Sequence, residues 1–167
     1  MPISMYDASV KPMRHMLTTL SSVLSKGAAH CEAKKIDPNA LLQSRLYPDM
    51  FPLVRQVQIA SDTAKGAGAR LAGVEIPSFE DTELTFADLQ ARIDRTIAFL
   101  DTLKPEQFAG AEERQVVIPL RSRTLEFTGK DYLLSWANPN FFFHVTTAYA
   151  LLRHGGVEIG KRDYLGG

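Results

Sequence analysis

Two long segments in the first half of the chain carry apolar residues at helical spacing, which predicts two amphipathic helices. The first covers 4–26 and ends at Gly27, and Pro12 inside it should bend the helix or mark a late start. The second begins at position 48 or 49 and runs to 72. Between them, an N-cap aspartate followed by a proline predicts a short helix over 38–44.

Two further long helices are predicted in the second half of the chain. Thr85 is suited to cap the first of them, with Asp88 at the third position of a near capping box. This helix should end before Pro105, because the residue that precedes a proline avoids helical angles. The last helical region covers 130–153 and should be interrupted or kinked before Pro139.

Two short runs of alternating apolar residues, 115–120 and 124–127, predict a β-hairpin directly before the last helix. Long connections over 74–84 and 105–129 leave room for crossovers between helices. The predicted fold is therefore all-α: one domain over 1–167 that forms a four-helix bundle with long crossover connections and a small β-hairpin insertion before the last helix.

The composition narrows the classes of partner and compartment. Lys+Arg and Asp+Glu each total 19, so the formal net charge is zero, which argues against a general nucleic-acid binder. No apolar run approaches the roughly 18–20 residues that span a bilayer. The single cysteine, Cys31, suits the reducing cytosol, and an incidental thiol in a connector is its simplest interpretation. We expect a cytoplasmic protein with no nucleic-acid and no membrane partner.

The end of the chain carries the most specific motif, the run GGVEIGK at 155–161 followed by DYLG at 163–166, after an apolar helix over 138–152. Together with 4–20 and 103–120, these segments resemble DUF1993 proteins, an uncharacterised branch of the DinB-like superfamily of candidate metalloenzymes. The resemblance implies a four-helix bundle with a characteristic crossover, often dimeric. It also implies a divalent metal held by one histidine on the second long helix and a His-x-x-x-His pair on the last. Some members are thiol-dependent transferases or hydrolases that act on small molecules.

The implied metal triad is incomplete in this sequence. His144 matches the first position of the pair, but the second position is Ala148, which cannot bind a metal. The second long helix contains no histidine, and its polar candidates are Gln58 and Asp62. We therefore expect no metal cofactor at the family's site, while a remodelled divalent-metal site around His144 and Asp62 stays open as an alternative.

His144 has three interpretations. It can be a buried neutral imidazole that is hydrogen-bonded to Gln58, Asp62 or a tyrosine, since buried polar groups are generally paired. It can also be a base or ligand-binding group in a pocket, oriented by Asp62. The third interpretation is a ligand of a remodelled metal site.

Three functions follow from these alternatives. The leading hypothesis is a small-molecule-binding or degenerate-enzyme domain, with a pocket between the second and last long helices lined by Gln58, Asp62, His144 and Tyr149. The second is a metal-dependent transferase or hydrolase that uses His144 and Asp62 with a ligand from Tyr6 or another helix. The third is a non-catalytic dimeric interaction protein that depends on its Phe-rich last helix. We expect the protein to form a homodimer, because three consecutive phenylalanines in that helix cannot all face inward.

Overall fold

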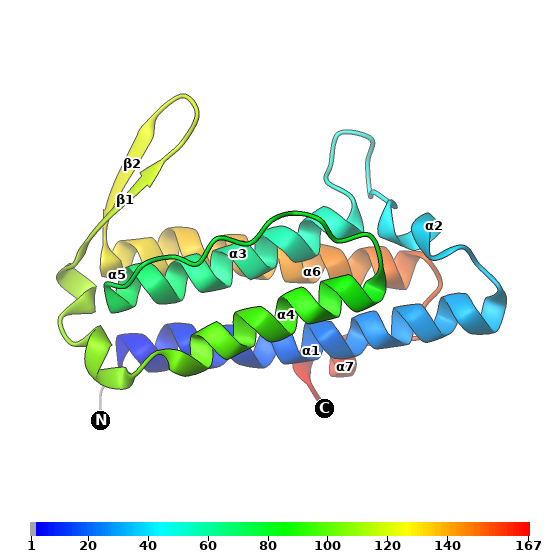
Figure 1. Cartoon of the computed structure of the whole chain (residues 1–167), viewed down its shortest axis with the longest axis horizontal. Coiled ribbons are helices and arrows are strands. Elements are labelled where there is room, and N and C mark those ends of the chain that lie inside the picture. The colour runs from blue at the N-terminus through cyan, green and yellow to red at the C-terminus, as the bar shows by residue number, and fades with distance from the viewer. Residues whose placement is uncertain (1–2) are drawn as a thin grey trace.

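Four long helices pack around one core in the computed structural model, which describes residues 3–167 (Figure 1). These helices are α1 (Met5–Lys34), α3 (Leu53–Ala72), α4 (Phe86–Thr102) and α6 (Asn138–His154). The predicted four-helix bundle is confirmed. Residues 1 and 2 of the predicted domain lie outside the described part of the chain.

One of the connections between consecutive long helices runs the full length of the bundle, namely the link from α3 to α4. α1 and α6 run in one direction, and α3 and α4 both run in the other (Figure 1). The link between α3 and α4, over 73–85, therefore returns along the bundle as an extended segment, which we call the strap. Shortly after the C-terminal end of α1, the short helix α2 (Pro38–Leu42) starts at the predicted Asp37 cap.

The predicted end of the first helix is wrong, because α1 continues through Gly27 to Lys34. A Cβ atom at Gly27 would lie 2.8 Å from Leu152 and 3.2 Å from Phe86. The missing side chain thus gives room to Leu152 of α6 and Phe86 of α4, and Gly27 is not a stop signal here. Cys31 consequently lies inside α1, where burial raises the pKa of its thiol above the ordinary value.

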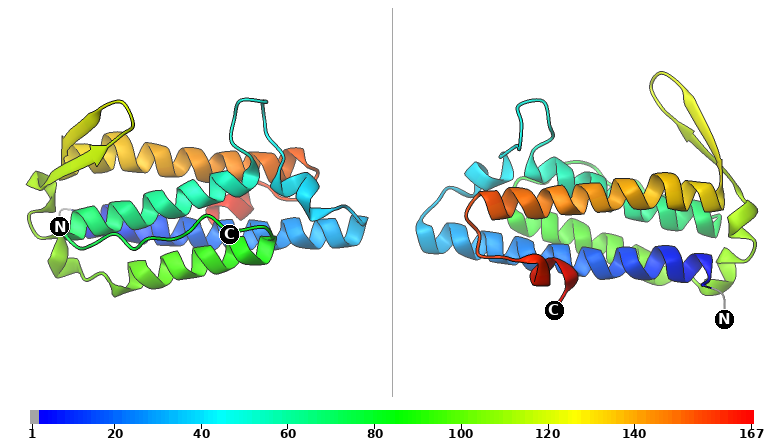
Figure 2. Two further views of the ribbon diagram at one scale, coloured as in Figure 1. Left: turned by 45° about the horizontal axis from the view of Figure 1, so that its top comes forward. Right: turned by 180° about the vertical axis from the view of Figure 1, so that it is seen from behind.

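The predicted start of the second helix is also displaced, since α3 begins at Leu53 after the N-cap Pro52. The residues of 43–52 form a loop that projects from the same side of the bundle as the hairpin in every view (Figures 1 and 2). Gly68 in α3 lies close to the side chains of Leu100 and Leu103, which fill the space beside it.

The capping box predicted for the third long helix is confirmed. Thr85 Oγ1 accepts a hydrogen bond from the amide of Asp88, whose carboxylate accepts one from the amide of Thr85. Two short 3₁₀ turns then lead to the hairpin, whose strands pair in antiparallel register; these four elements are η1 (Pro105–Phe108), η2 (Ala111–Glu113), β1 (Gln115–Pro119) and β2 (Thr124–Thr128).

The interruption predicted before Pro139 is present as a wider helical turn. After α5 (Gly129–Asp131), the segment η3 (Tyr132–Ala137) is π-helical and runs directly into α6. Pro139 has no amide hydrogen to donate to the preceding turn, and a π-helical segment accommodates that lost bond without ending the helix.

The tail includes α7 (Lys161–Leu165), which packs on α1. No helix within 3–167 has the length and apolar character needed to cross a membrane.

Candidate functional site

His144 lies in the middle of α6 and is hydrogen-bonded to α3. Its Nδ1 atom lies 2.6 Å from Oε1 of Gln56, and the side chain is 9% exposed. The sequence-based choice of partner is wrong, because neither Gln58, nor Asp62, nor a tyrosine makes this bond. The choice failed by two residues along α3, because Gln56 is the amide that faces α6.

The contacts of Gln56 determine which nitrogen of His144 carries the proton. Nε2 of Gln56 donates to the carbonyl oxygen of Phe51 at 3.0 Å, so its Oε1 is the atom that faces His144. Nδ1 of His144 therefore donates, and Nε2 of the neutral ring keeps its lone pair. Within 3–167 the only fully enclosed side-chain nitrogen or oxygen without a partner is Asn138 Oδ1. Nε2 of His144, which has no hydrogen-bond partner among the described residues, is therefore not fully enclosed.

The surroundings of His144 favour its neutral form. Burial lowers the pKa of His144 below its ordinary value of 6.5, and the positive charge of Arg55 lowers it further. A neutral imidazole with one bonded nitrogen and one free nitrogen is able to act as a base or as a hydrogen-bond acceptor at neutral pH.

Acidification should destabilise the protein through this histidine. Because the folded-state pKa is depressed, the folded protein binds fewer protons than the unfolded chain, so the contribution is full above pH 6.5 and is lost as the pH falls below it. We expect His144→Gln to flatten the pH dependence of the free energy of unfolding between about pH 5 and 8. Urea titrations at several pH values would measure it, with exposed His154→Gln as the matched control. Equal slopes for wild type and His144→Gln would contradict the assignment.

A shallow pocket of about 460 Å³ lies on the outer side of α6, and His144 is not among the residues that line it. Phe143 connects the two, because it lines the pocket and its ring stands edge-on to the His144 ring at 5.1 Å between centroids. The walls are largely apolar, with two threonine hydroxyls, and the lining residues are Leu46, Pro139, Phe142, Phe143, Thr146, Thr147 and Ala150. A small apolar molecule with one polar group suits these walls.

Gln58 and Asp62 belong to a different cluster, on the side of α3 that faces α4 and the strap. Gln58 donates to Glu83 at 2.8 Å, and Asp62 accepts from Arg92 at 2.8 Å. Arg92 is completely buried and also contacts Glu83 at 3.1 Å and Asp81 at 3.0 Å. The cluster ties the strap to α3 and α4, and it does not contact His144.

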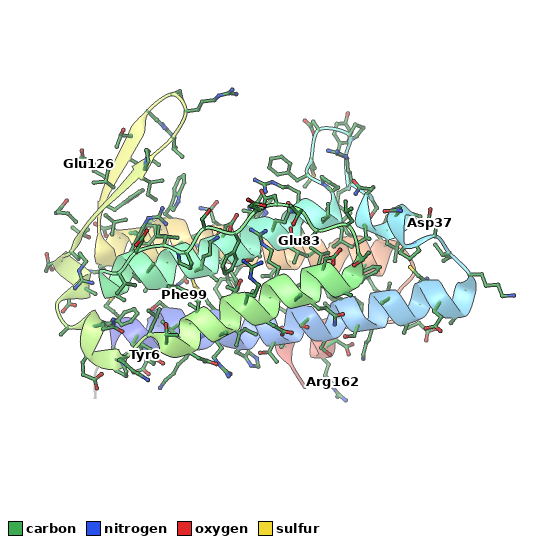
Figure 3. All side chains as sticks on the ribbon, in the orientation of Figure 1. Tyr6, Asp37, Glu83, Phe99, Glu126 and Arg162 are labelled. Atoms are coloured by element: carbon green, nitrogen blue, oxygen red, sulfur yellow. The ribbon has the colours of Figure 1, made fainter. Side chains whose placement is uncertain are left out.

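The two predicted tyrosines also lie away from His144. Tyr149 packs edge-on against Tyr164 of α7, with 5.8 Å between ring centroids. Tyr6 packs against Phe108 at 5.3 Å, at the end of the bundle that carries the hairpin (Figure 3). Of the five predicted site residues, His144 alone therefore lies in the site, and the structure adds Gln56 as its partner.

The donor set around His144 does not fit the metal site that the superfamily implies. Residue 148, one turn after His144, is a buried alanine, and the position facing His144 on α3 is the amide of Gln56. Across residues 3–167, no three His, Cys, Asp or Glu side chains come together as a metal-binding group. One imidazole and one amide oxygen are too few ligands for a structural or catalytic zinc site.

Three comparisons place the chain among known proteins. A model of the family described as "Domain of unknown function (DUF1993)" matches residues 5–165. A crystal structure of a DinB family member protein from Shewanella denitrificans is 43% identical in sequence and superposes with a TM-score of 0.91, over 97% of this chain and 92% of that one. No curated protein matches this sequence at a significant level.

Proposed function

Because the chain belongs to the DUF1993 family and has the DinB fold, we propose that it is a small-molecule-binding domain in which His144 has taken over a metal-free role. The observation that carries this proposal is the Gln56–His144 pair. It fixes the neutral tautomer and leaves a lone pair on Nε2, and His144 contacts Phe143, which lines an apolar pocket. The lone buried Cys31 supports a reducing compartment, the cytoplasm.

The ligand class follows from the walls and the acceptor. An apolar or aromatic body would pack against Phe142, Phe143 and Leu46, and a hydroxyl or amide N–H would donate to Nε2 of His144. Gln56 serves as the positioning residue, since its carbonyl holds the proton on Nδ1. Hydrogen bonding to a neutral acceptor in a partly desolvated site contributes about 0.5–1.5 kcal/mol, so the apolar walls must provide much of the affinity.

Phenol is a suitable first probe, because it combines an aromatic body with one hydroxyl donor. We expect phenol to shift the ring ¹⁵N resonance of His144 Nε2 and to raise the melting temperature of the wild type. Gln56→Ala and His144→Ala should remove the thermal shift, while exposed His154→Ala should keep it. Phenol that binds all four proteins alike, or none, would overturn the proposal. Stoichiometric zinc that is lost in His144→Ala would instead support the metal-dependent enzyme.

A second candidate function, self-association as a homodimer, is favoured by exposed apolar side chains around the same pocket. Phe143 is 54% exposed, and the neighbouring loop adds Leu46, Tyr47 and Phe51 at 46%, 65% and 52%. Leu46 and Phe143 line the pocket together, and exposed apolar surface that gathers in this way commonly marks an interaction site. A second copy seated on this face would cover the pocket, so dimer formation and ligand binding would be coupled there.

Phe143→Asp should convert a wild-type dimer to a monomer, because it places a charge in the middle of the apolar surface. Leu165→Asp is the matched control, since Leu165 is 55% exposed but lies on α7. Sedimentation equilibrium would distinguish these outcomes. A wild type that stays monomeric at high micromolar concentration excludes the homodimer and leaves the small-molecule proposal intact.

A further inference from the structure

A second pocket, of about 380 Å³, lies between α3 and the strap. Its lining includes two cationic side chains of α3, Lys65 and Arg70, and an apolar wall from the strap formed by Ile76, Pro77 and Phe79. Gln56 and Arg70 are 14 residues apart on α3, which corresponds to about 21 Å along the helix. This pocket is therefore separate from the one beside His144.

Arg70 is a half-buried cation that has no acidic partner in the described part of the chain. Its one side-chain hydrogen bond there is donated by Nη1 to the hydroxyl of Tyr132 at 3.3 Å. None of its nitrogens is both fully enclosed and without a partner, so Nε and Nη2, which make no hydrogen bond within 3–167, are not fully enclosed. A guanidinium in this state presents a planar pair of donors that suits a carboxylate or phosphate group.

The position of the Arg70 guanidinium depends on a glycine one turn earlier. A Cβ atom at Gly66 would lie 2.6 Å from Nη1 of Arg70, so the absent side chain lets the guanidinium lie across the helix backbone. The same nitrogen donates to the hydroxyl of Tyr132, which is 2% exposed, and the guanidinium carbon lies 5.8 Å from the centre of the tyrosine ring. Arg70 is thereby oriented before any ligand arrives, which lowers the entropic cost of binding.

The remaining charges in the pocket leave it attractive to anions. Asp62 is the one carboxylate in the lining, and a single oxygen of it already contacts Lys65 at 2.7 Å and Arg92 at 2.8 Å. Lys65 is 5% exposed, and its ammonium also sits 4.1 Å from the centre of the Phe79 ring. Arg92 also pairs with Asp81 and Glu83, so these charges are matched within the cluster, whereas no ion pair within 3–167 offsets the positive charge of Arg70.

We propose that this pocket binds a small organic anion, with its phosphate or carboxylate group on the Arg70 fork and its apolar body against Phe79 and Pro77. Lys65 adds long-range attraction, and the exposed hydroxyl of Ser78 on the strap is placed to complete the polar side of the site. The proposal does not depend on the function of His144. It assigns the guanidinium of Arg70 a ligand of the chemistry that its free donors recognise.

Calorimetric titration at constant ionic strength tests this assignment with three probes: phenyl phosphate, benzoate and inorganic phosphate. Phenyl phosphate should bind saturably, and its affinity should fall about tenfold or more in Arg70→Gln and in Arg70→Lys, which keeps the charge but loses the fork. Benzoate that binds as well as phenyl phosphate would show that a carboxylate is sufficient. Inorganic phosphate should bind more weakly, because it lacks the apolar body.

Arg95→Gln is the matched control, since Arg95 also lies over Phe79, at 4.1 Å, but does not line the pocket. We expect the affinity of Arg95→Gln for phenyl phosphate to stay within about twofold of the wild type. Arg95 lies outside the pocket lining, and salt screens its longer-range attraction for the anion. Circular dichroism would confirm that each variant is folded. Two results overturn the proposal: no saturable binding to the wild type, or an equal loss in Arg70→Gln and Arg95→Gln, which indicates unspecific attraction.

Discussion

Replacing Arg92 with methionine should lower the free energy of unfolding by about 3 kcal/mol, near the lower limit for breaking a buried ion pair. Arg92 is completely buried, and it contacts Asp62, Asp81 and Glu83 while donating to the carbonyl oxygen of Glu80 at 3.1 Å. Without it, the buried carboxylate of Glu83 loses the cation that compensates its charge. The strap would lose most of its attachment to α4 at the same time.

The solvent exposure of Asp62, Asp81 and Glu83 explains why the stability loss in Arg92→Met should be about 3 kcal/mol. The side chains of Asp62 and Asp81 are 37% and 42% exposed, so water would hydrate them after the arginine is removed. The side chain of Glu83 is only 6% exposed, and most of the penalty arises there. A second substitution, Glu83→Gln, should therefore recover about 1–2 kcal/mol in the Arg92→Met background.

Urea denaturation and thermal melting would measure both variants. A loss of about 3 kcal/mol corresponds to a fall of about 6–12 °C in melting temperature for a domain of this size. Arg14→Met is the control, since Arg14 pairs with Asp101 at 2.6 Å but each side chain is 49% exposed. Its loss should stay below about 1 kcal/mol. If Arg92→Met costs no more than Arg14→Met, the buried cluster does not hold the strap.

Local features of the fold were predictable from the sequence, and those that depend on distant contacts were not. Thr85 and Asp88 identified a helix start because a capping box is complete within four residues. Gly27 predicted a helix end, yet it lies inside α1, because its lack of a side chain serves the packing of Leu152 and Phe86. Helix propensity is a weak signal when tertiary packing sets the requirement.

The candidate site was predicted in part. His144 was identifiable as a polar residue on an apolar helix, whereas its partner depends on the rotation of α3, which the displaced helix start concealed. With the helix beginning at Leu53, Gln56 falls on the buried stripe three residues later. Arg92 carried a similar signal, because it lies three residues after the buried Leu89. No local pattern places the strap acids beside Arg92, since the crossover brings them there.

Gly129→Ala should lower the free energy of unfolding by about 3 kcal/mol, at the upper end of the usual cost of overpacking. Gly129 begins α5 directly after the hairpin, and a Cβ atom there would overlap the carbonyl oxygen of Ala111 and lie 3.2 Å from Leu71. A flexible side chain could move aside, but a backbone carbonyl can move only with its 3₁₀ turn. Relief of the clash would therefore separate η2 from the start of the last helical region.

Gly160→Ala is the matched control for this substitution, because no heavy atom lies within 4 Å of a Cβ atom at Gly160 and its φ of −135° is extended backbone. Because Gly160 is the N-cap of α7, where alanine is less favourable than glycine, the change should cost no more than about 1 kcal/mol. Urea denaturation of the two variants would compare the same chemical change with and without a backbone neighbour. Gly129→Ala within about 0.5 kcal/mol of the wild type would show that η2 yields freely. In that case the close contact between Gly129 and Ala111 does not determine how the chain turns into α5 and η3.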